Sequence, residues 1–476
     1  MIRRTLGQVA RMCGGTLAHG QRDSDIEIAG VTRDSRTAGA GELYVPLIGE
    51  NFDGHDFAAE TLAKGAAASL WEEGIVIPDE LQDAPLVLVP DTLSALQRLA
   101  SAYRDELGLR VIGITGSNGK TTTKDLTAAV LGTVFRVHKT EGNLNNHIGV
   151  PLTILQLDEK TETAVLEMGM SDFGEIELLA TIASPDAAII TNIGDAHMQQ
   201  LGSRAGIAQA KLEIAEGLKD GGALIFNGDE PLLRERLASM ELLDGTELVP
   251  FGDAPDCKWS AANIKVSVDS STFDVVSPLL TAEEAEALRG VLLPVPGEHN
   301  VMNALAAIAA AYRFGVPAAS IREGLSNVVL TGMRIQPVTA FNGAKLLNDA
   351  YNANPTATRA AIDLVEQLTG YRRKWVVLAD MLELGDQEVE MHRSVGSYVT
   401  PEKADALLTW GSLAQYIAEG ASEAFAAAGR ADDVRHFAHK EELASWLREH
   451  LHSDDLVLVK GSRGMRMEQV VQALES

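Results

Sequence analysis

Short apolar runs alternate with stretches of helical spacing along most of the chain after residue 110. Such runs are typical of buried strands, and the stretches between them repeat apolar positions every three or four residues, as a helix does. They predict strands at 110–115, 163–168, 187–192 and 222–227, and helices near 120–131, 203–218 and 230–239. Strands and helices that alternate in this way form βαβ units, so the pattern predicts a parallel sheet covered on both faces.

Both ends of the chain also mix strands and helices. Residues 1–105 combine short predicted strands at 27–32, 43–46 and 86–89 with one clear helix at 57–64. A strand-like segment at 259–280 precedes an alanine-rich helix at 301–312, and strands follow at 345–350, 374–379, 405–409 and 456–460. We therefore expect three α/β domains: a small N-terminal module at 1–105, a central domain at 106–330, and a Rossmann-like C-terminal domain at 331–476.

Length and charge limit the class of protein. A chain of 476 residues fits about three domains. Its formal net charge of −27 argues against non-specific binding to nucleic acid or to an anionic membrane surface. We expect no membrane insertion and no signal peptide, because no apolar run reaches ~18 residues and the N-terminus lacks an apolar segment. The two cysteines, Cys13 and Cys257, indicate neither a disulfide framework nor a zinc site, so we expect a cytoplasmic protein.

One glycine-rich loop lies between a predicted strand and a predicted helix. It reads Gly113-Ile114-Thr115-Gly116-Ser117-Asn118-Gly119-Lys120-Thr121-Thr122-Thr123-Lys124. A helix N-terminus presents free N–H groups to an anion, while Lys120 suits phosphates and the Thr121 hydroxyl suits magnesium. Ile114 stands where the longer standard pattern has a glycine, so the match is to a shorter variant. The loop predicts a P-loop-type ATPase domain, with an ordinary glycine-rich turn as the alternative.

Polar residues also follow other predicted strands of the central domain. Glu167 and His197 lie just past strand ends, where a magnesium-ligand role competes with that of a solvated surface group. Lys211 lies on a predicted helix, where a solvated lysine paired with a neighbouring carboxylate is expected. Asn300 fits either a helix N-cap or a contact to an adenine edge.

The predicted strands of the last domain end in polar segments as well. These segments are Asp349-Ala350-Tyr351-Asn352-Ala353-Asn354-Pro355, Asp380-Met381-Leu382-Glu383-Leu384-Gly385 and Lys460-Gly461-Ser462-Arg463. Ligands of parallel sheets collect beyond the carboxyl ends of the strands. We therefore expect a ligand cleft between the central and C-terminal domains.

Taken in order, these segments resemble the Mur ligase family, the ATP-dependent amide-forming enzymes of bacterial peptidoglycan assembly. The phosphate loop and the segments around Glu167, 192–197 and His299-Asn300 resemble the family's central domain. The three C-terminal segments, with Asp34-Ser35-Arg36 and Phe52-Asp53-Gly54-His55-Asp56-Phe57, resemble the members that join D-alanyl-D-alanine to UDP-N-acetylmuramoyl-tripeptide. Ala379 and Asn348 depart from the glycine and the acid that are common there.

The resemblance implies a role for each matching residue. ATP contacts are implied at Gly116, Ser117, Asn118, Gly119, Lys120, Thr121, Thr122, Asn300, Asn303, Arg334 and Asp349. Ligands of two magnesium ions are implied at Thr121, Glu167, His197 and Lys211, the last as a carbamylated lysine. Substrate contacts are implied at Ser35, Arg36, Asn143, Asn145, Asn146, Tyr351, Asn352, Asp380 and Lys460. Catalytic roles are implied at Lys120, His197, Lys211 and Arg334.

The implied activity is an ATP-dependent ligation through an acyl phosphate, carried out by a monomer on small-molecule substrates. Two alternatives remain open. Another ligase of the superfamily, such as a folylpolyglutamate synthase, would share the ATP loop but gives no reason for Asp34-Ser35-Arg36 or for Tyr351-Asn352-Ala353-Asn354. A P-loop switch protein would bind nucleotide without ligating anything.

Overall fold

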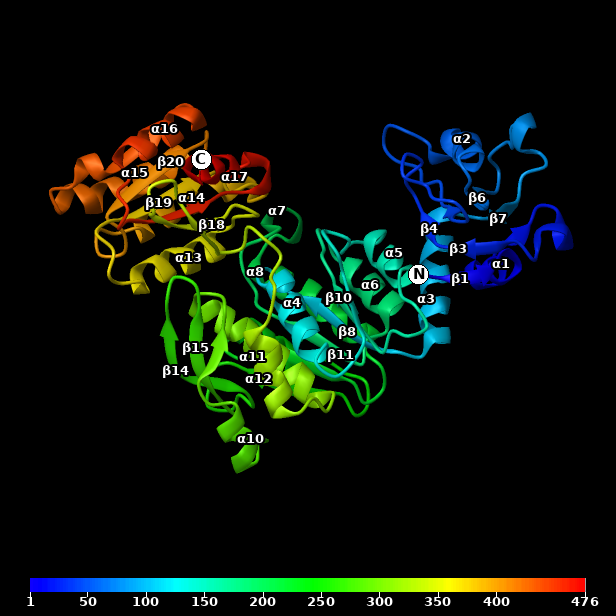
Figure 1. Ribbon diagram of the computed structural model, residues 1–476, viewed down its shortest axis with the longest axis horizontal. Helices are drawn as coiled ribbons and strands as arrows, with labels where there is room; N and C mark the ends of the chain where they lie inside the picture. The colour runs from blue at the N-terminus through cyan, green and yellow to red at the C-terminus, as the bar shows by residue number, and fades with distance from the viewer. Residues whose placement is uncertain (476) are drawn as a thin grey trace.

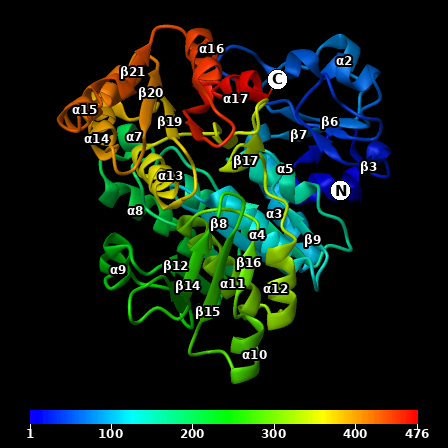
Figure 2. The same ribbon diagram turned by 60° about the vertical axis from the view of Figure 1, so that its left-hand side comes forward.

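The computed structural model describes residues 1–475 as three α/β units that follow one another along the chain. In Figure 1 the blue N-terminal unit lies at the right, the cyan and green central unit in the middle, and the orange and red C-terminal unit at the upper left. Figure 2 shows these units after a rotation of 60°. The predicted α/β class is therefore confirmed. Within residues 1–475, no helix is both long and apolar enough to cross a membrane.

The N-terminal unit contains more helix than the sequence pattern predicted. Its main sheet has the order β2-β7-β6-β5-β4, and β1 pairs separately with β3. The strands are β1 (Arg3–Thr5), β2 (Thr16–Leu17), β3 (Glu27–Ala29), β4 (Val31–Thr32), β5 (Leu43–Tyr44), β6 (Ala68–Glu72) and β7 (Leu86–Val89). The helices are α1 (Leu6–Cys13), α2 (Ala58–Ala63) and α3 (Thr92–Leu107). Only α2 was predicted, although α3 has clear caps in Asp91, which accepts from the Ser94 N–H, and left-handed Gly108.

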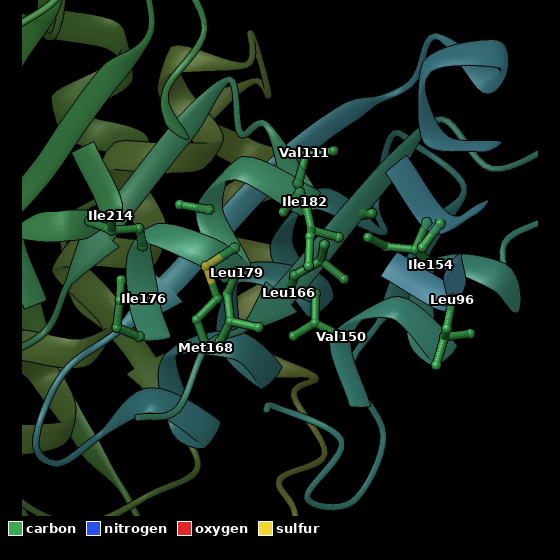
Figure 3. Close-up of a cluster of buried hydrophobic side chains, with 14 of the residues drawn as sticks. Leu96, Val111, Val150, Ile154, Leu166, Met168, Ile176, Leu179, Ile182 and Ile214 are labelled. Atoms are coloured by element: carbon green, nitrogen blue, oxygen red, sulfur yellow. The ribbon is translucent and has the colours of Figure 1, made fainter. Parts of the chain in front are cut away.

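Helix α3 connects the first two units, and the predicted boundary at residue 105 falls inside it. Leu96 of α3 belongs to the same apolar cluster as Val150 and Ile154 of α5 (Gly149–Leu155) and Ile182 of α6 (Glu175–Ala183). Figure 3 shows these side chains together. The N-terminal and central units therefore share one core, which fixes their relative position by packing.

The central unit is a fully parallel six-stranded sheet in the order β13-β12-β11-β8-β10-β9. Its strands are β8 (Arg110–Thr115), β9 (Val137–Lys139), β10 (Thr163–Glu167), β11 (Ala187–Ile190), β12 (Ala223–Asn227) and β13 (Glu247–Phe251). One face packs on α4 (Lys120–Leu131) and α11 (Glu298–Arg313), and the other on α5, α6 and α8 (Arg204–Leu212). The predicted parallel sheet with two covered faces is therefore confirmed.

Smaller elements complete the central unit. An antiparallel sheet has the order β14-β15-β16, and several short helices belong to the same unit. These elements are α7 (Met198–Leu201), α9 (Pro231–Leu237), β14 (Ser260–Val266), β15 (Ser271–Val276), α10 (Ala282–Ala287), β16 (Val291–Leu293) and α12 (Ala318–Ser326).

The C-terminal unit is a second six-stranded sheet in the order β17-β18-β22-β19-β20-β21. Its strands are β17 (Gln336–Thr339), β18 (Lys345–Asp349), β19 (Lys374–Ala379), β20 (Ala406–Trp410), β21 (Val434–Phe437) and β22 (Leu456–Lys460), and only β17 runs antiparallel. Its helices are α13 (Pro355–Gln367), α14 (Glu388–Tyr398), α15 (Ala414–Ala427), α16 (Lys440–His450) and α17 (Glu468–Glu475). The carboxyl ends of β18, β22 and β19 lie side by side, where doubly wound sheets bind ligands.

The segment that leads into the C-terminal unit is tied to α4 by a buried carboxylate. Asp125 accepts hydrogen bonds from the Thr331 N–H at 2.8 Å and from its hydroxyl at 2.9 Å. Its other oxygen accepts from the Lys139 ammonium at 2.6 Å, and Lys124 lies 3.5 Å away. Although burial opposes ionisation, the bond from Lys139, the charge of Lys124 and the bond from Thr331 together hold the pKa of Asp125 below its usual range.

We expect Asp125→Asn to destabilise the protein by about 3 kcal/mol at pH 7, because it leaves Lys124 buried without its partner. The folded-state pKa lies below the unfolded value of about 3.9, so the carboxylate stabilises the fold above that pH. The difference between the variants should therefore shrink as the pH falls through the folded-state pKa. Urea unfolding at several pH values measures both effects, with exposed Asp105→Asn as the control. Equal midpoints for Asp125→Asn and wild type at pH 7 would contradict the assignment.

Candidate active site

The glycine-rich loop forms the turn between β8 and α4, as the sequence predicted. Gly116 has a φ of 150° and Gly119, the N-cap of α4, a φ of 79°. A Cβ at Gly116 would collide with the Thr191 hydroxyl, and one at Gly119 would collide with the Asn303 amide. Both positions therefore require glycine, and the loop leaves the first N–H groups of a twelve-residue helix facing outward for an anion.

Side chains around the loop bring a lysine, a hydroxyl and a carboxylate together. The Lys120 ammonium donates to the Gly116 carbonyl at 2.7 Å, inside the loop itself. The Thr121 hydroxyl donates to Glu167 at 2.8 Å, and Asn145 donates to the other Glu167 oxygen at 2.9 Å. Burial lowers the pKa of Lys120, with an opposing effect of Glu167. The structure thus gathers the predicted phosphate lysine and the predicted magnesium pair.

Arg334 reaches this group from the segment that enters the C-terminal unit. Its Nη2 donates to the Thr121 hydroxyl at 2.9 Å, and its guanidinium lies 4.1 Å from the centre of the Tyr351 ring. Met333 and Ile335 on either side have φ values of 61° and 49°, which only a strained backbone gives to such residues. The surrounding structure therefore holds the backbone on both sides of Arg334 in a strained conformation.

A cavity of about 350 Å³ lies between the loop and the C-terminal unit. We call it the first cavity. The predicted residues that line it are Ser117, Asn118, Gly119, Lys120, Thr121, Thr122, Asn145, Glu167, Asn300, Asn303, Arg334, Asp349, Tyr351, Asn352 and Lys460. The buried Ser117 hydroxyl and Arg334 Nε have no hydrogen-bond partner among the described residues. Unsatisfied polar atoms of this kind fit a polar ligand such as a nucleotide phosphate.

Asp349 and Lys460 form a buried ion pair at the ends of neighbouring strands β18 and β22. Lys460 also donates to the Asn352 carbonyl at 2.9 Å, and Asp349 accepts from the Ile335 N–H at 3.2 Å. The pair therefore connects the end of the sheet to the backbone next to Arg334.

Lys211 on α8 is not the solvated lysine that the sequence pattern suggested. Its side chain is only 2% exposed, and its ammonium has no hydrogen bond or ion pair with any of residues 1–475. Burial and then the charge of Lys120 lower the pKa of Lys211 well below its usual range. A buried amine without a partner is costly unless it is neutral or chemically modified.

His197 lies at the N-terminus of α7 with a left-handed φ of 63°. Burial, and then the nearby charges of Lys120 and Lys211, lower its pKa to about 4. The imidazole is therefore neutral at pH 7, the form that can ligate a metal. Within residues 1–475, no three His, Cys, Asp or Glu side chains gather as a metal cluster. A magnesium ion here would need oxygens from phosphate and water, as this ion commonly does.

Three family models cover most of the chain. They describe the Mur ligase family catalytic domain at residues 27–104, the Mur ligase middle domain at 114–311, and the Mur ligase glutamate ligase domain at 333–463. A Bacillus subtilis protein named UDP-N-acetylmuramoyl-tripeptide--D-alanyl-D-alanine ligase is 48% identical over 100% of this chain and 99% of its own length. The chain belongs to the Mur ligase family.

Solved structures extend the likeness to the whole fold of this Mur ligase. A MurF crystal structure from Acinetobacter baumannii has a TM-score of 0.87 at 30% identity, covering 100% of this chain and 99% of that one. MurF from Thermotoga maritima, solved in complex with ADP, has a TM-score of 0.80 at 27% identity, covering 94% and 97%. The three-unit architecture is therefore that of a Mur ligase.

Some predicted residues of this Mur ligase have other contacts. Asp380 accepts from the N–H groups of Leu413 and Ala414 at 3.0 and 2.7 Å, so it caps α15 and lies outside the first cavity. Asn146 accepts from the Gly149 N–H at 2.9 Å and caps α5. The predicted N-cap role of Asn300 is wrong, because α11 starts one turn earlier, with Gly297 as its cap.

The residues predicted to bind the UDP-linked substrate, Ser35, Arg36 and Asn143, do not line the first cavity. Ser35 and Arg36 are in the N-terminal unit, where Asp34 accepts both Arg36 Nε at 2.9 Å and Nη2 at 2.7 Å. That contact lowers the pKa of Asp34 to about 2. The Arg36 side chain is 84% exposed, and Asn143 is exposed too. Their substrate roles stay predictions.

The sequence interpretation missed the contacts that join the central unit to the C-terminal unit. Asn354 donates to the Asn118 side-chain oxygen at 2.6 Å, and the Thr356 hydroxyl donates to Asp195 at 2.7 Å. Both residues stand in the first turn of α13, and both line the first cavity. Their place just after a polar strand end was the available signal, but the sequence does not say which loop faces it.

Proposed function

We propose that this Mur ligase joins D-alanyl-D-alanine to UDP-N-acetylmuramoyl-tripeptide at the expense of ATP, in peptidoglycan precursor synthesis. The observation that carries the proposal is the full-length identity of 48% to the B. subtilis ligase of that name. The first cavity supports it, because a phosphate loop faces polar side chains from a second unit there. We further propose that the enzyme acts in the cytoplasm as a monomer.

ATP would lie in the first cavity with its phosphates on the N-terminus of α4. Lys120 and Arg334 would contact the outer phosphates, and Ser117 offers its unpartnered hydroxyl. Asn300 and Asn303 would face the base, and Asp349 the ribose. The ADP complex of the T. maritima relative supports a nucleotide in this family of sites.

The predicted magnesium ligands form two groups, and the oxygen ligands among them suit this ion best. Thr121 and Glu167 lie in contact at 2.8 Å and would hold one ion, whereas neutral His197 and a carbamylated Lys211 would hold a second. A carbamate would turn the buried amine into an oxygen ligand, which suits a hard cation. Magnesium bound there would neutralise charge on the phosphates.

The chain's own residues would manage charge during an acyl-phosphate mechanism. In the first step the tripeptide carboxylate attacks the γ-phosphate, which releases ADP and sets two anions against each other. Lys120 and Arg334 would stabilise the charge that builds up between them. In the second step the dipeptide amine displaces phosphate. The contact of Asn354 with Asn118 of the phosphate loop and that of Thr356 with Asp195 would keep the C-terminal unit closed over the acyl phosphate and exclude water.

The UDP-linked substrate would enter from the N-terminal side. Ser35 and Arg36 would hold the UDP, and Asn143, Asn145 and Asn146 would face the sugar and peptide. Asn145 already contacts Glu167 at 2.9 Å, so this loop reaches the nucleotide site.

Phosphate release measured with the substrates added singly and together tests the proposal. We expect release only when ATP, UDP-N-acetylmuramoyl-tripeptide and D-alanyl-D-alanine are all present. A folylpolyglutamate synthase would require a folate and glutamate instead, and a P-loop switch protein would hydrolyse nucleotide without either substrate. Phosphate release that does not depend on the dipeptide would overturn the proposed function.

A further inference from the structure

The segment between α12 and β17 crosses from the central unit to the C-terminal unit (Figure 2). We call residues 327–335 the linker segment. It carries Arg334, whose guanidinium contacts the Thr121 hydroxyl beside the phosphate loop. Three residues earlier, Thr331 is held by the buried carboxylate of Asp125. Asp125 is therefore separated from a cation of the site by only a few residues of chain.

The linker segment is attached at two points to one face of α4. Thr121 and Asp125 are four residues apart in this helix, so their side chains leave the same face about 6 Å apart along the axis. At the first point, Arg334 Nη2 donates to the Thr121 hydroxyl at 2.9 Å. At the second point, Asp125 accepts from the Thr331 N–H at 2.8 Å and from its hydroxyl at 2.9 Å. The chain between the two points thus spans a single turn of the helix.

Asp125 itself does not reach the nucleotide site. Its side chain is only 1% exposed, and it does not line the first cavity. Its Oδ1 accepts from the Lys139 ammonium at 2.6 Å, while its Oδ2 accepts both bonds from Thr331. Any effect of Asp125 on the reaction must therefore pass through the linker segment.

The other side of Arg334 is attached to the C-terminal unit. The Ile335 N–H donates to Asp349 at 3.2 Å, and the Met333 carbonyl accepts from the Tyr351 N–H at 3.3 Å. Arg334 thus lies between an attachment to α4 and an attachment to the end of β18. Because Met333 and Ile335 have φ values of 61° and 49°, this backbone keeps its shape only while both attachments hold it. Loss of the attachment to α4 would let the guanidinium turn away from the phosphate loop.

We propose that Asp125 is a positioning residue, which holds Thr331 and thereby directs the Arg334 guanidinium at the phosphate that is transferred. This assignment rests on the proposed function, in which Arg334 contacts the outer phosphates of ATP. The N–H groups of a guanidinium lie in one plane, so they meet a phosphate well only when the direction of the side chain is fixed. Without Asp125 the positive charge would remain but its direction would vary, which weakens contacts in the transition state more than it weakens nucleotide binding.

Steady-state kinetics of variants at both ends of the contact tests the assignment. Asp125→Ala should lower kcat about 10- to 100-fold, the range expected when hydrogen bonds to a charged group are lost, with less than about a threefold change in the KM for ATP. Thr331→Val removes only the hydroxyl and should lower kcat about 3- to 10-fold, whereas Thr331→Ser should keep the wild-type value. Val329→Ala is the matched control and should behave as wild type, because Val329 belongs to the same segment but is 83% exposed.

A double-mutant cycle separates positioning from a purely structural effect. Arg334→Ala should lower kcat about 100- to 1,000-fold, which leaves a turnover that can be measured. In that background Asp125→Ala and Thr331→Val should lower kcat no further, because they act through the missing guanidinium. A residue that only stabilised the fold would lower kcat by the same factor in both backgrounds. Since Asp125→Ala leaves Lys124 buried without its partner, Thr331→Val decides the result if the first variant does not fold.

The outcomes separate this inference from the proposed function. Wild-type phosphate release that does not depend on the tripeptide nucleotide and the dipeptide would overturn both. Normal ligation by wild type together with an unchanged kcat in folded Asp125→Ala or Thr331→Val would overturn the positioning role alone. An equal loss in both backgrounds, or a Thr331→Ser variant as slow as Thr331→Val, would also overturn it. So would a higher KM for ATP with an unchanged kcat, because the contact would then serve nucleotide binding.

Discussion

Lys120→Ala is expected to lower ATP-dependent ligation about 1,000-fold, the size of effect seen when a preorganised electrostatic contact is removed. The Lys120 ammonium is held 2.7 Å from the Gly116 carbonyl and lies next to Glu167 and Arg334. Alanine removes the point charge at the outer phosphates but keeps the helix N-terminus. The loss should therefore appear mainly in kcat, because charge rearrangement in the transition state depends on the lysine more than ground-state binding does.

Coupled phosphate-release kinetics at saturating substrates measures the effect, with exposed Lys265→Ala on β14 as the control. Thermal unfolding should show an equal or higher midpoint for Lys120→Ala, since the folded variant no longer buries an ammonium. A folded variant with turnover close to wild type would rule out the phosphate-lysine role.

Much of the fold could be predicted, because the spacing of apolar residues along the sequence agrees with the side chains that the structure buries. The strands at 110–115 and 374–379 match β8 and β19 to the residue, since both are buried on two faces and read as continuous apolar runs. The predicted helix at 203–218 is shorter in the structure. It ends at Leu212 and continues as a 3-10 turn, which hydrophobic spacing alone does not distinguish from an α-helix.

The N-terminal unit shows where pattern reading fails. The unpredicted strands β1 and β2 have only three and two residues, too few to give a period, and α1 has only eight residues. The missed helix α3 has another cause. Its apolar residues pack against two units at once, and the predicted boundary at 105 stays a prediction.

The candidate site also has parts that the sequence predicts and parts that it does not. The phosphate loop could be predicted, because strand, glycine turn and helix are local in sequence. Contacts between units could not be predicted, because nothing local tells that Asn354 meets Asn118 or that Glu383 meets His197. Asp380 shows a contact of another kind, and its substrate role stays a prediction. A carboxylate at a strand end looks available for a ligand, yet here it accepts the first N–H groups of α15.

The pKa shifts of Lys211 and His197 connect these two residues to Lys120 of the phosphate loop. Burial and the charge of Lys120 lower the pKa of both Lys211 and His197, and Lys211 adds to the shift of His197. The cationic side chains at this end of the site are Lys120 and Arg334, with Glu167 as a nearby carboxylate, and a bound anion would add counter-charge. Substrate phosphates would supply that charge, and so would a carbamate on Lys211, which links nucleotide binding to the state of this lysine.

Lys211→Ala is expected to lower ligation at least about 100-fold and to recover part of the activity when a short carboxylate such as formate or acetate is added. Because its pKa is lowered well below 10.5, the buried amine is present in its neutral, nucleophilic form at a lower pH than an exposed lysine. The neutral amine can add to carbon dioxide, forming an N–C bond and releasing a proton, and the product is an anion near the positive charge of Lys120.

Kinetics of Lys211→Ala with and without added carboxylate measures the prediction. Lys219→Ala is the matched control, because the Lys219 ammonium pairs with Asp186 at a distance of 2.9 Å and lies outside the site. Lys211→Arg should be as inactive as the alanine variant, since a guanidinium keeps the positive charge but cannot form the carbamate. The activity of wild type should also fall when carbon dioxide is removed and return when bicarbonate is restored. Full activity of Lys211→Arg would mean that a positive charge is what the site needs, and the carbamate would have to be abandoned.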